Sequence, residues 1–98
     1  MKNIKIRTKE YKTSDYLKTP KDIAAYLNEV LEDDDPKLLM LALRNVADSQ
    51  GGIATIAEHT GLNRESLYKT LSGKRNPRIE TINSILHTYG LRLSVTVN

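Results

Sequence analysis

Prolines and glycines divide the middle of the chain into short segments, and this division constrains the fold more than any other feature. Thr19-Pro20 and Asp35-Pro36 each place a capping residue before a proline at the first helical position, where proline is favoured. Glycine commonly ends a helix because it tolerates positive φ, and glycines end the later segments. They are Gly51, Gly52, Gly61, Gly73 and Gly90. This pattern predicts five short helices over about 20–32, 36–49, 53–60, 64–71 and 79–89.

Apolar residues recur within these segments at spacings of three and four, which is the period of an amphipathic helix. The second segment is apolar nearly all round, so we expect it to be the most buried. The predicted core positions are Ile23, Tyr26, Leu27, Val30 and Leu31, then Leu38 to Val46, then Ile53, Ile56 and Ala57, then Leu67 and Leu71, and finally Ile79, Ile82, Ile85, Leu86 and Tyr89.

The last residues have a different period. Leu91 to Val97 alternate apolar and polar side chains and include β-branched residues, which is typical of a half-buried strand. A strand with no partner in its own chain can pair with another chain. We therefore expect an all-α fold with a short C-terminal β-strand at 91–97. We also expect this strand and the fifth helix to form a dimer surface.

Charge is distributed unevenly along the chain. Residues 1–19 hold six basic and two acidic side chains, residues 20–60 hold three and eight, and residues 61–98 hold six and two. The formal charge of +3 therefore conceals a polarised molecule, as expected when one face meets a polyanion. The alternative is that charges lie wherever solvent allows. We predict a basic N-terminal arm at 1–18 and a single domain at 19–98.

Composition excludes several other classes of protein. The chain has no cysteine, so it has neither disulfides nor a thiolate metal site. His59 and His87 are far apart, and Asp33-Asp34-Asp35 lacks the alternating ligands of a calcium loop, so we expect no metal and no cofactor. The longest apolar run, Leu38 to Leu43, is far below the roughly 20 residues that span a bilayer. We expect a cytoplasmic protein with no membrane contact.

Residues 53–73 carry the arrangement on which a functional interpretation depends. Ala57 lies one turn before Gly61, and Gly61-Leu62-Asn63 leads into the segment that bears Leu67. A small residue at Ala57 lets two helices cross in contact, and Gly61 supplies the conformation of the turn. Leu62 and Leu67 are expected to fill the wedge between the helices. The spacing predicts a helix-turn-helix.

The outer side of the 64–71 segment then displays polar side chains that are able to bond base edges or phosphates. Beyond it, the link at 73–78 adds three cations where a chain leaving a DNA groove runs along the phosphate backbone. The predicted DNA-binding residues are Asn63, Arg64, Glu65, Ser66, Tyr68, Lys69, Lys74, Arg75, Asn76 and Arg78. An ordinary helical bundle without such a role is the alternative.

The stretch from Gly52 to Gly73, with Asn76-Pro77 and Gly90-Leu91-Arg92-Leu93 after it, resembles the addiction-module antidote proteins. These are HigA-like antitoxins of the Xre, phage-repressor-type group. The resemblance implies a five-helix, phage-repressor-like fold with a DNA-reading helix at 63–71. It also implies a homodimer that binds an inverted-repeat operator in its own promoter and a partner toxin of the RelE/ParE-like type.

Two positions depart from the pattern of the family. Thr70 stands where phage-type repressors usually have an apolar residue. Glu65 is unusual beside phosphates, and it either accepts a hydrogen bond from cytosine or pairs with Arg64 or Lys69.

The sequence therefore predicts a sequence-specific repressor of double-stranded DNA that is also the antitoxin of a type II toxin-antitoxin module and controls its own promoter. The alternative is an interaction module that keeps the helix-turn-helix fold and binds a toxin or another basic partner without reading DNA. We do not expect an enzyme, because no nucleophile, base or phosphate-cradling loop is assembled in the sequence.

Overall fold

A computed structural model of the chain describes residues 16–74 and 76–98. Within that part the fold is all-α. Its five helices are α2 (Pro20–Leu31), α3 (Pro36–Ser49), α4 (Ile53–Thr60), α5 (Arg64–Leu71) and α6 (Ile79–Thr88). The five segments predicted from proline, glycine and capping signals are confirmed, with ends that differ by one residue at most. The basic arm predicted for 1–18 lies, except for its last three residues, outside the described residues.

The first two helices begin as their sequences predict. Thr19 and Asp22 form a capping box, in which the Thr19 hydroxyl accepts from the Asp22 amide at 3.1 Å and the Asp22 carboxylate accepts from the Thr19 amide at 3.1 Å. The Lys18 amide also donates to that carboxylate, and this bond is the main cause of a lowered pKa for Asp22. The Asp35 carboxylate caps α3 by accepting from the Lys37 amide at 2.9 Å.

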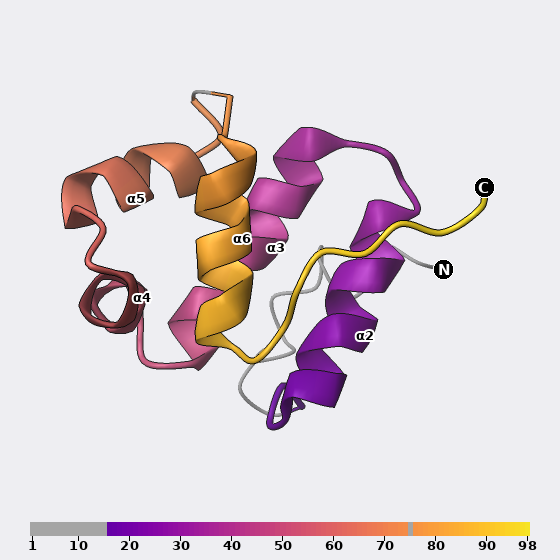
Figure 1. Cartoon of the computed structure of the whole chain (residues 1–98), viewed down its shortest axis with the longest axis horizontal. Coiled ribbons are helices and arrows are strands. Elements are labelled where there is room, and N and C mark those ends of the chain that lie inside the picture. Colours follow the sequence, from indigo (N-terminus) through magenta and orange to yellow (C-terminus); the bar gives the residue numbers. More distant parts are fainter. Residues whose placement is uncertain (1–15, 75) are drawn as a thin grey trace.

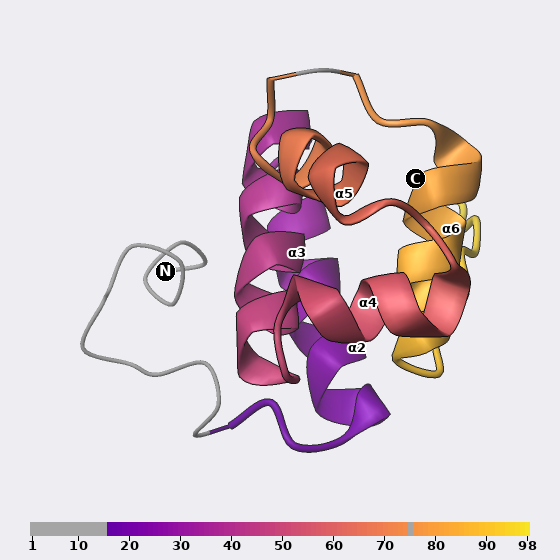
Figure 2. The ribbon, with the colours of Figure 1, turned by 90° about the vertical axis from the view of Figure 1, so that its left-hand side faces the viewer.

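Helix α3 is the centre of the bundle, because α2, α4 and α5 all pack against it while α6 packs against α4. Figures 1 and 2 show α2 on one side of α3 and the α4–α5 pair across the other side. Ala42, Leu43, Val46 and Ala47 of α3 are completely buried. The expectation that this helix is the most buried is therefore confirmed over its second half, whereas Leu41 on its outer side remains 44% exposed.

The core also contains residues from every other helix and one from the segment before α2. Leu17 is only 2% exposed, and the Gln50 side-chain amide donates to its carbonyl oxygen at 2.7 Å. Besides Leu41, two predicted core positions are exposed. Leu31 is 48% exposed at the last residue of α2, and Ile79 is 75% exposed at the first residue of α6. The apolar spacing at these two helix ends does not lead to burial, whereas Ile53 and Leu71, which also end helices, are buried.

The predicted C-terminal strand is not present. Residues 91–98 have no regular secondary structure and run from the end of α6 across α2 (Figure 1). The Leu91 amide still donates to the Leu86 carbonyl oxygen at 2.9 Å, which ties the start of this tail to α6. A strand needs a neighbour for its ladder of hydrogen bonds, and the described part of the chain provides none. The prediction of a strand at 91–97 is therefore wrong for the single chain.

None of the described helices is both long and apolar enough to cross a membrane. No group of three or more histidine or acidic side chains able to hold a metal ion occurs in the described ranges 16–74 and 76–98.

Candidate nucleic-acid interface

Helices α4 and α5 are joined by a short turn that hydrogen bonds hold in place. Gly61 has φ of +77°, and its amide donates to the Ala57 carbonyl oxygen at 2.8 Å. The Thr60 hydroxyl donates to the Ile56 carbonyl oxygen at 2.7 Å and accepts from the Leu62 amide at 3.1 Å. Ala57 and Leu62 are partly buried and pack against the core, as predicted. The turn therefore fixes the direction in which α5 leaves α4.

Helix α5 begins at a side-chain cap. The Asn63 side-chain oxygen accepts from the Ser66 amide at 3.1 Å, which satisfies one of the free amides at the start of the helix. The acidic Glu65 lies in the first turn and the basic Lys69 in the last, so both complement the helix dipole. Asn63 was predicted as a DNA-binding residue, and its oxygen is now seen to be used within the chain. Its side-chain NH2 group remains as a donor.

The two sides of α5 differ sharply in character. Leu67, Thr70 and Leu71 are buried, at 1%, 7% and 2% exposure. The hydroxyl-bearing Thr70 thus occupies the buried position at which an apolar residue is usual. The opposite side is exposed to solvent and carries Arg64, Glu65, Ser66, Tyr68 and Lys69. Figure 2 shows α5 at the surface of the molecule, near one end of α3 and beside α4.

Tyr68 is held by a residue that sequence reasoning missed. The guanidinium carbon of Arg44, on α3, lies 5.5 Å from the centre of the Tyr68 ring, within the range of a cation–π contact. The Arg44 Nε atom lies 3.8 Å from an Asp48 carboxylate oxygen one turn along α3. Tyr68 is 49% exposed, so its ring is braced on one side while the other meets solvent. The Arg44–Asp48 spacing is visible in the sequence, whereas the contact with Tyr68 depends on how α3 and α5 pack.

The link between α5 and α6 adds exposed polar residues at the C-terminal end of α5 (Figure 1). Lys74 is exposed, and its amide donates to the Ser72 hydroxyl at 3.4 Å. Asn76 is also exposed. Arg78 occupies the cap position of α6, and its guanidinium lies 3.7 Å from the Glu80 carboxylate. Both side chains of that pair are more than three-quarters exposed, so Arg78 stays accessible to another anion. The predicted site residue Arg75 lies outside the described residues.

The described members of the predicted site therefore lie on two consecutive elements, the outer side of α5 and the link that follows it. The cations among them are Arg64, Lys69, Lys74 and Arg78. The arrangement provides hydrogen-bond donors on a short exposed helix, with positive charge at its beginning and beyond its end. Such a surface is suited to an anionic, grooved partner.

Taken together, the described residues form a small all-α fold in which α4 and α5 are a tightly turned pair with one polar outer side. The sequence model of a protein family described as "probable addiction module antidote protein" matches residues 7–97. The chain belongs to this family, and the resemblance found in the sequence is confirmed.

A relative from Haemophilus influenzae, described only as an uncharacterized protein, is 33% identical over 87 residues. The aligned region covers 89% of each of the two chains. No solved structure matches this chain significantly.

Proposed function

We propose that this protein is a sequence-specific repressor of double-stranded DNA that also serves as the antitoxin of a type II toxin-antitoxin module. Membership of the antidote family supports the antitoxin role. The single observation that carries the DNA-binding role is the two-sided character of α5, which buries Leu67, Thr70 and Leu71 and leaves the polar residues of its outer side exposed.

In this proposal α4 and α5 act as a phage-repressor-like helix-turn-helix, and α5 enters the major groove. An α-helix fits that groove, where each base pair presents its own pattern of donors and acceptors. Arg64 near the start of α5 reads guanine through two hydrogen bonds, while Ser66 and the NH2 group of Asn63 donate to nearby acceptors. Lys69, Lys74, Arg75 and Arg78 contact phosphates, with Asn76 and Tyr68 beside them. These contacts supply affinity that does not depend on sequence.

One helix of eight residues reads too few base pairs to select a single promoter, so the active form is a homodimer. Two copies related by a two-fold axis place their α5 helices in successive major grooves, about 34–36 Å apart. The operator is then an inverted repeat in the promoter of the protein's own gene. The partner toxin is of the RelE/ParE-like type, and the protein neutralises it by binding, without enzymatic activity of its own.

The test measures binding to DNA from the protein's own promoter, against unrelated DNA of the same length, at two salt concentrations. Arg64→Ala is expected to weaken specific binding by about 1–3 kcal/mol for each half-site and to relax the preference for one base position in each. Lys69→Ala is expected to weaken binding to both DNAs and to reduce the slope of log K against log salt by about two, because each copy in the dimer loses one phosphate contact.

Lys21→Ala is the matched control. It removes the same charge from an exposed position of α2, away from α4 and α5 (Figure 1), and should leave both binding constants nearly unchanged. If the wild-type protein binds neither DNA at low salt, yet still binds its toxin, the alternative of an interaction module that does not read DNA replaces this proposal.

A further inference from the structure

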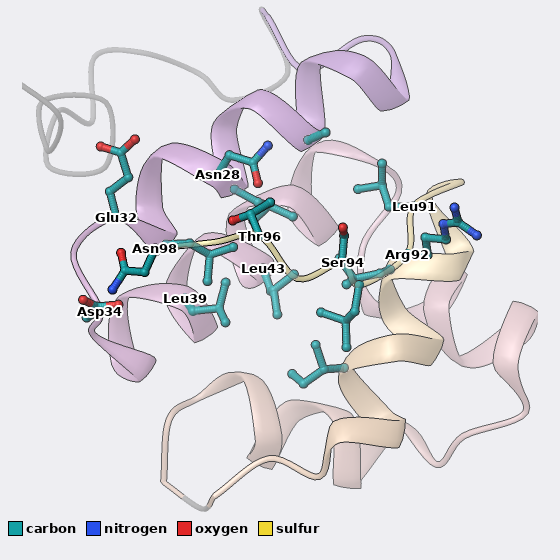
Figure 3. Close-up of a pocket in the computed structure, with 16 residues that line it drawn as sticks. Asn28, Glu32, Asp34, Leu39, Leu43, Leu91, Arg92, Ser94, Thr96 and Asn98 are labelled. Carbon is teal, nitrogen blue, oxygen red and sulfur yellow. The ribbon is translucent and has the colours of Figure 1, made fainter.

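The tail after α6 covers a groove that it does not fill. An open groove of about 920 Å³ lies between α2, α3, α6 and the tail (Figure 3). Leucines from three helices line it, namely Leu27, Leu31, Leu39, Leu43 and Leu86. The tail residues that line it are Leu91, Arg92, Leu93, Ser94, Thr96 and Asn98.

The tail presents the wrong residues to this groove. Leu91 and Leu93 line it, but farther along Ser94 and Thr96 take their place, whereas Val95 and Val97 are 95% and 100% exposed. Successive side chains of a regular strand point to opposite faces, so a strand from 91 to 97 places all four apolar side chains on one face. The single chain therefore sets polar groups over leucines and leaves two valines in water.

We propose that residues 91–97 form a two-stranded antiparallel ribbon with the same segment of a second copy of this chain, about a two-fold axis at Ser94. Pairing imposes the regular alternation that one chain lacks. Leu91, Leu93, Val95 and Val97 then share the face that covers the groove, and the hydroxyl groups turn to solvent. The two-fold axis is perpendicular to the ribbon, so both grooves lie beneath the same apolar face.

The segment is complementary to itself, and this favours a second copy over an unrelated strand. With the axis at Ser94, Leu93 lies opposite Val95 of the second copy, and Leu91 lies opposite Val97. Apolar cross-strand pairs of this kind stabilise a sheet. The segment's one charged residue, Arg92, lies opposite Thr96 rather than opposite another arginine, so no like charges meet.

The location of the tail fits the dimer required by the proposed function, on which this inference rests. Figure 1 shows the tail passing in front of α2, on the side of α6 away from α4 and α5. Pairing through the tail therefore leaves the polar side of α5 uncovered.

Single cysteines test the register, because the chain has no cysteine of its own. At the two-fold axis the two copies of residue 94 have Cα atoms about 4.5–5.5 Å apart, which a disulfide spans. Ser94→Cys is expected to give a covalent dimer under mild oxidation. Thr96→Cys is the matched control, because its two copies are about 14 Å apart along the ribbon and should not join.

Charge substitutions test the buried face. Val95→Lys should raise the dissociation constant of the dimer, measured by sedimentation equilibrium, by roughly ten-fold or more. Thr96→Gln should change it by no more than about two-fold, because that position turns to solvent in the ribbon and a neutral side chain does not repel the facing Arg92 of the second copy. Val95 is exposed in the single chain, so its variant should keep the helical circular dichroism of the wild type.

Three results overturn the inference: equal cross-linking at 94 and 96, a dimer unaffected by Val95→Lys, or a chain that stays monomeric at all concentrations. In the last case, loss of toxin binding by Val95→Lys would assign the tail to the toxin. Arg64→Ala separates this inference from the proposed function, since it should weaken specific DNA binding while Ser94→Cys cross-linking in the same background persists.

Discussion

Tyr89 lies at the end of α6 with its hydroxyl group buried and without a hydrogen-bond partner among the described residues. The side chain is 8% exposed. Burial, with a smaller contribution from the Asp48 carboxylate, raises the pKa of Tyr89 to about 12. The neutral phenol is therefore strongly preferred in the folded protein, and ionisation of this residue opposes folding.

Tyr89→Phe tests this assignment through pH. The pKa is raised on folding, so the contribution of Tyr89 is intact below about pH 10 and is lost as the pH rises toward 12. Relative to the variant, the wild type should lose about 1 kcal/mol of unfolding free energy between pH 8 and pH 11. Urea unfolding of both proteins at the two pH values measures the difference. A constant difference would contradict the shifted pKa.

Gly61 determines the path of the turn between α4 and α5. Its φ of +77° is disfavoured for residues with a Cβ atom, although nothing lies within 4 Å of the position that such an atom would occupy. Gly61→Ala should therefore destabilise the protein by about 1–2 kcal/mol through backbone conformation alone. Gly61→Asn should cost less, because asparagine tolerates this conformation better. Chemical denaturation compares the two, and equal losses would indicate a steric cause instead.

At the scale of elements, the helices could be predicted because their start and stop signals are local. Pro20 and Pro36 with their caps, and Gly61 in its left-handed conformation, act within a few residues of the chain. Whether residues 91–97 form a strand could not be predicted from such local signals. The alternation of apolar and polar side chains indicates a preference for extended backbone. The strand itself forms only where another segment provides hydrogen-bond partners.

In the candidate site, too, local features could be predicted from the sequence and contacts between distant residues could not. The outer residues of α5 could be predicted because burial of Leu67 and Leu71 determines which side faces solvent. The bracing of Tyr68 by Arg44 could not be predicted, because 24 residues separate the two positions in the chain and packing of α3 on α5 brings them together. The position of Asn63 before α5 predicts that its side-chain oxygen caps the helix. It does not by itself show that only the NH2 group is then left to contact DNA.

Asn63→Ala should shorten or loosen the first turn of α5 and destabilise the protein by about 1 kcal/mol, because the Ser66 amide loses its acceptor. Asn63→Ser keeps a capping oxygen and should keep most of that stability while removing the NH2 donor. Thermal unfolding measures the first effect, and operator binding by the serine variant measures the contribution of the donor. Unchanged stability of Asn63→Ala would contradict the role of the cap.

At the scale of the whole molecule, the proposed homodimer makes operator spacing a test, because it joins two α5 helices across one two-fold axis. Inserting five base pairs between the half-sites rotates one by about half a turn, onto the opposite side of the duplex. Operator affinity should then fall at least about ten-fold toward that of one half-site. Gel-shift titration of wild-type and spaced operators measures the change. Equal affinity for both would mean that the copies bind independently.

The separation of buried and exposed residues on α5 has an evolutionary consequence. Leu67 and Leu71 anchor the helix, while Arg64, Glu65 and Lys69 contribute nothing to the core. The outward residues are thus free to change without loss of the scaffold. Under the proposed function, duplicated genes of this kind can diverge in the promoters that they recognise by a few surface substitutions, and neighbouring modules then need not silence each other.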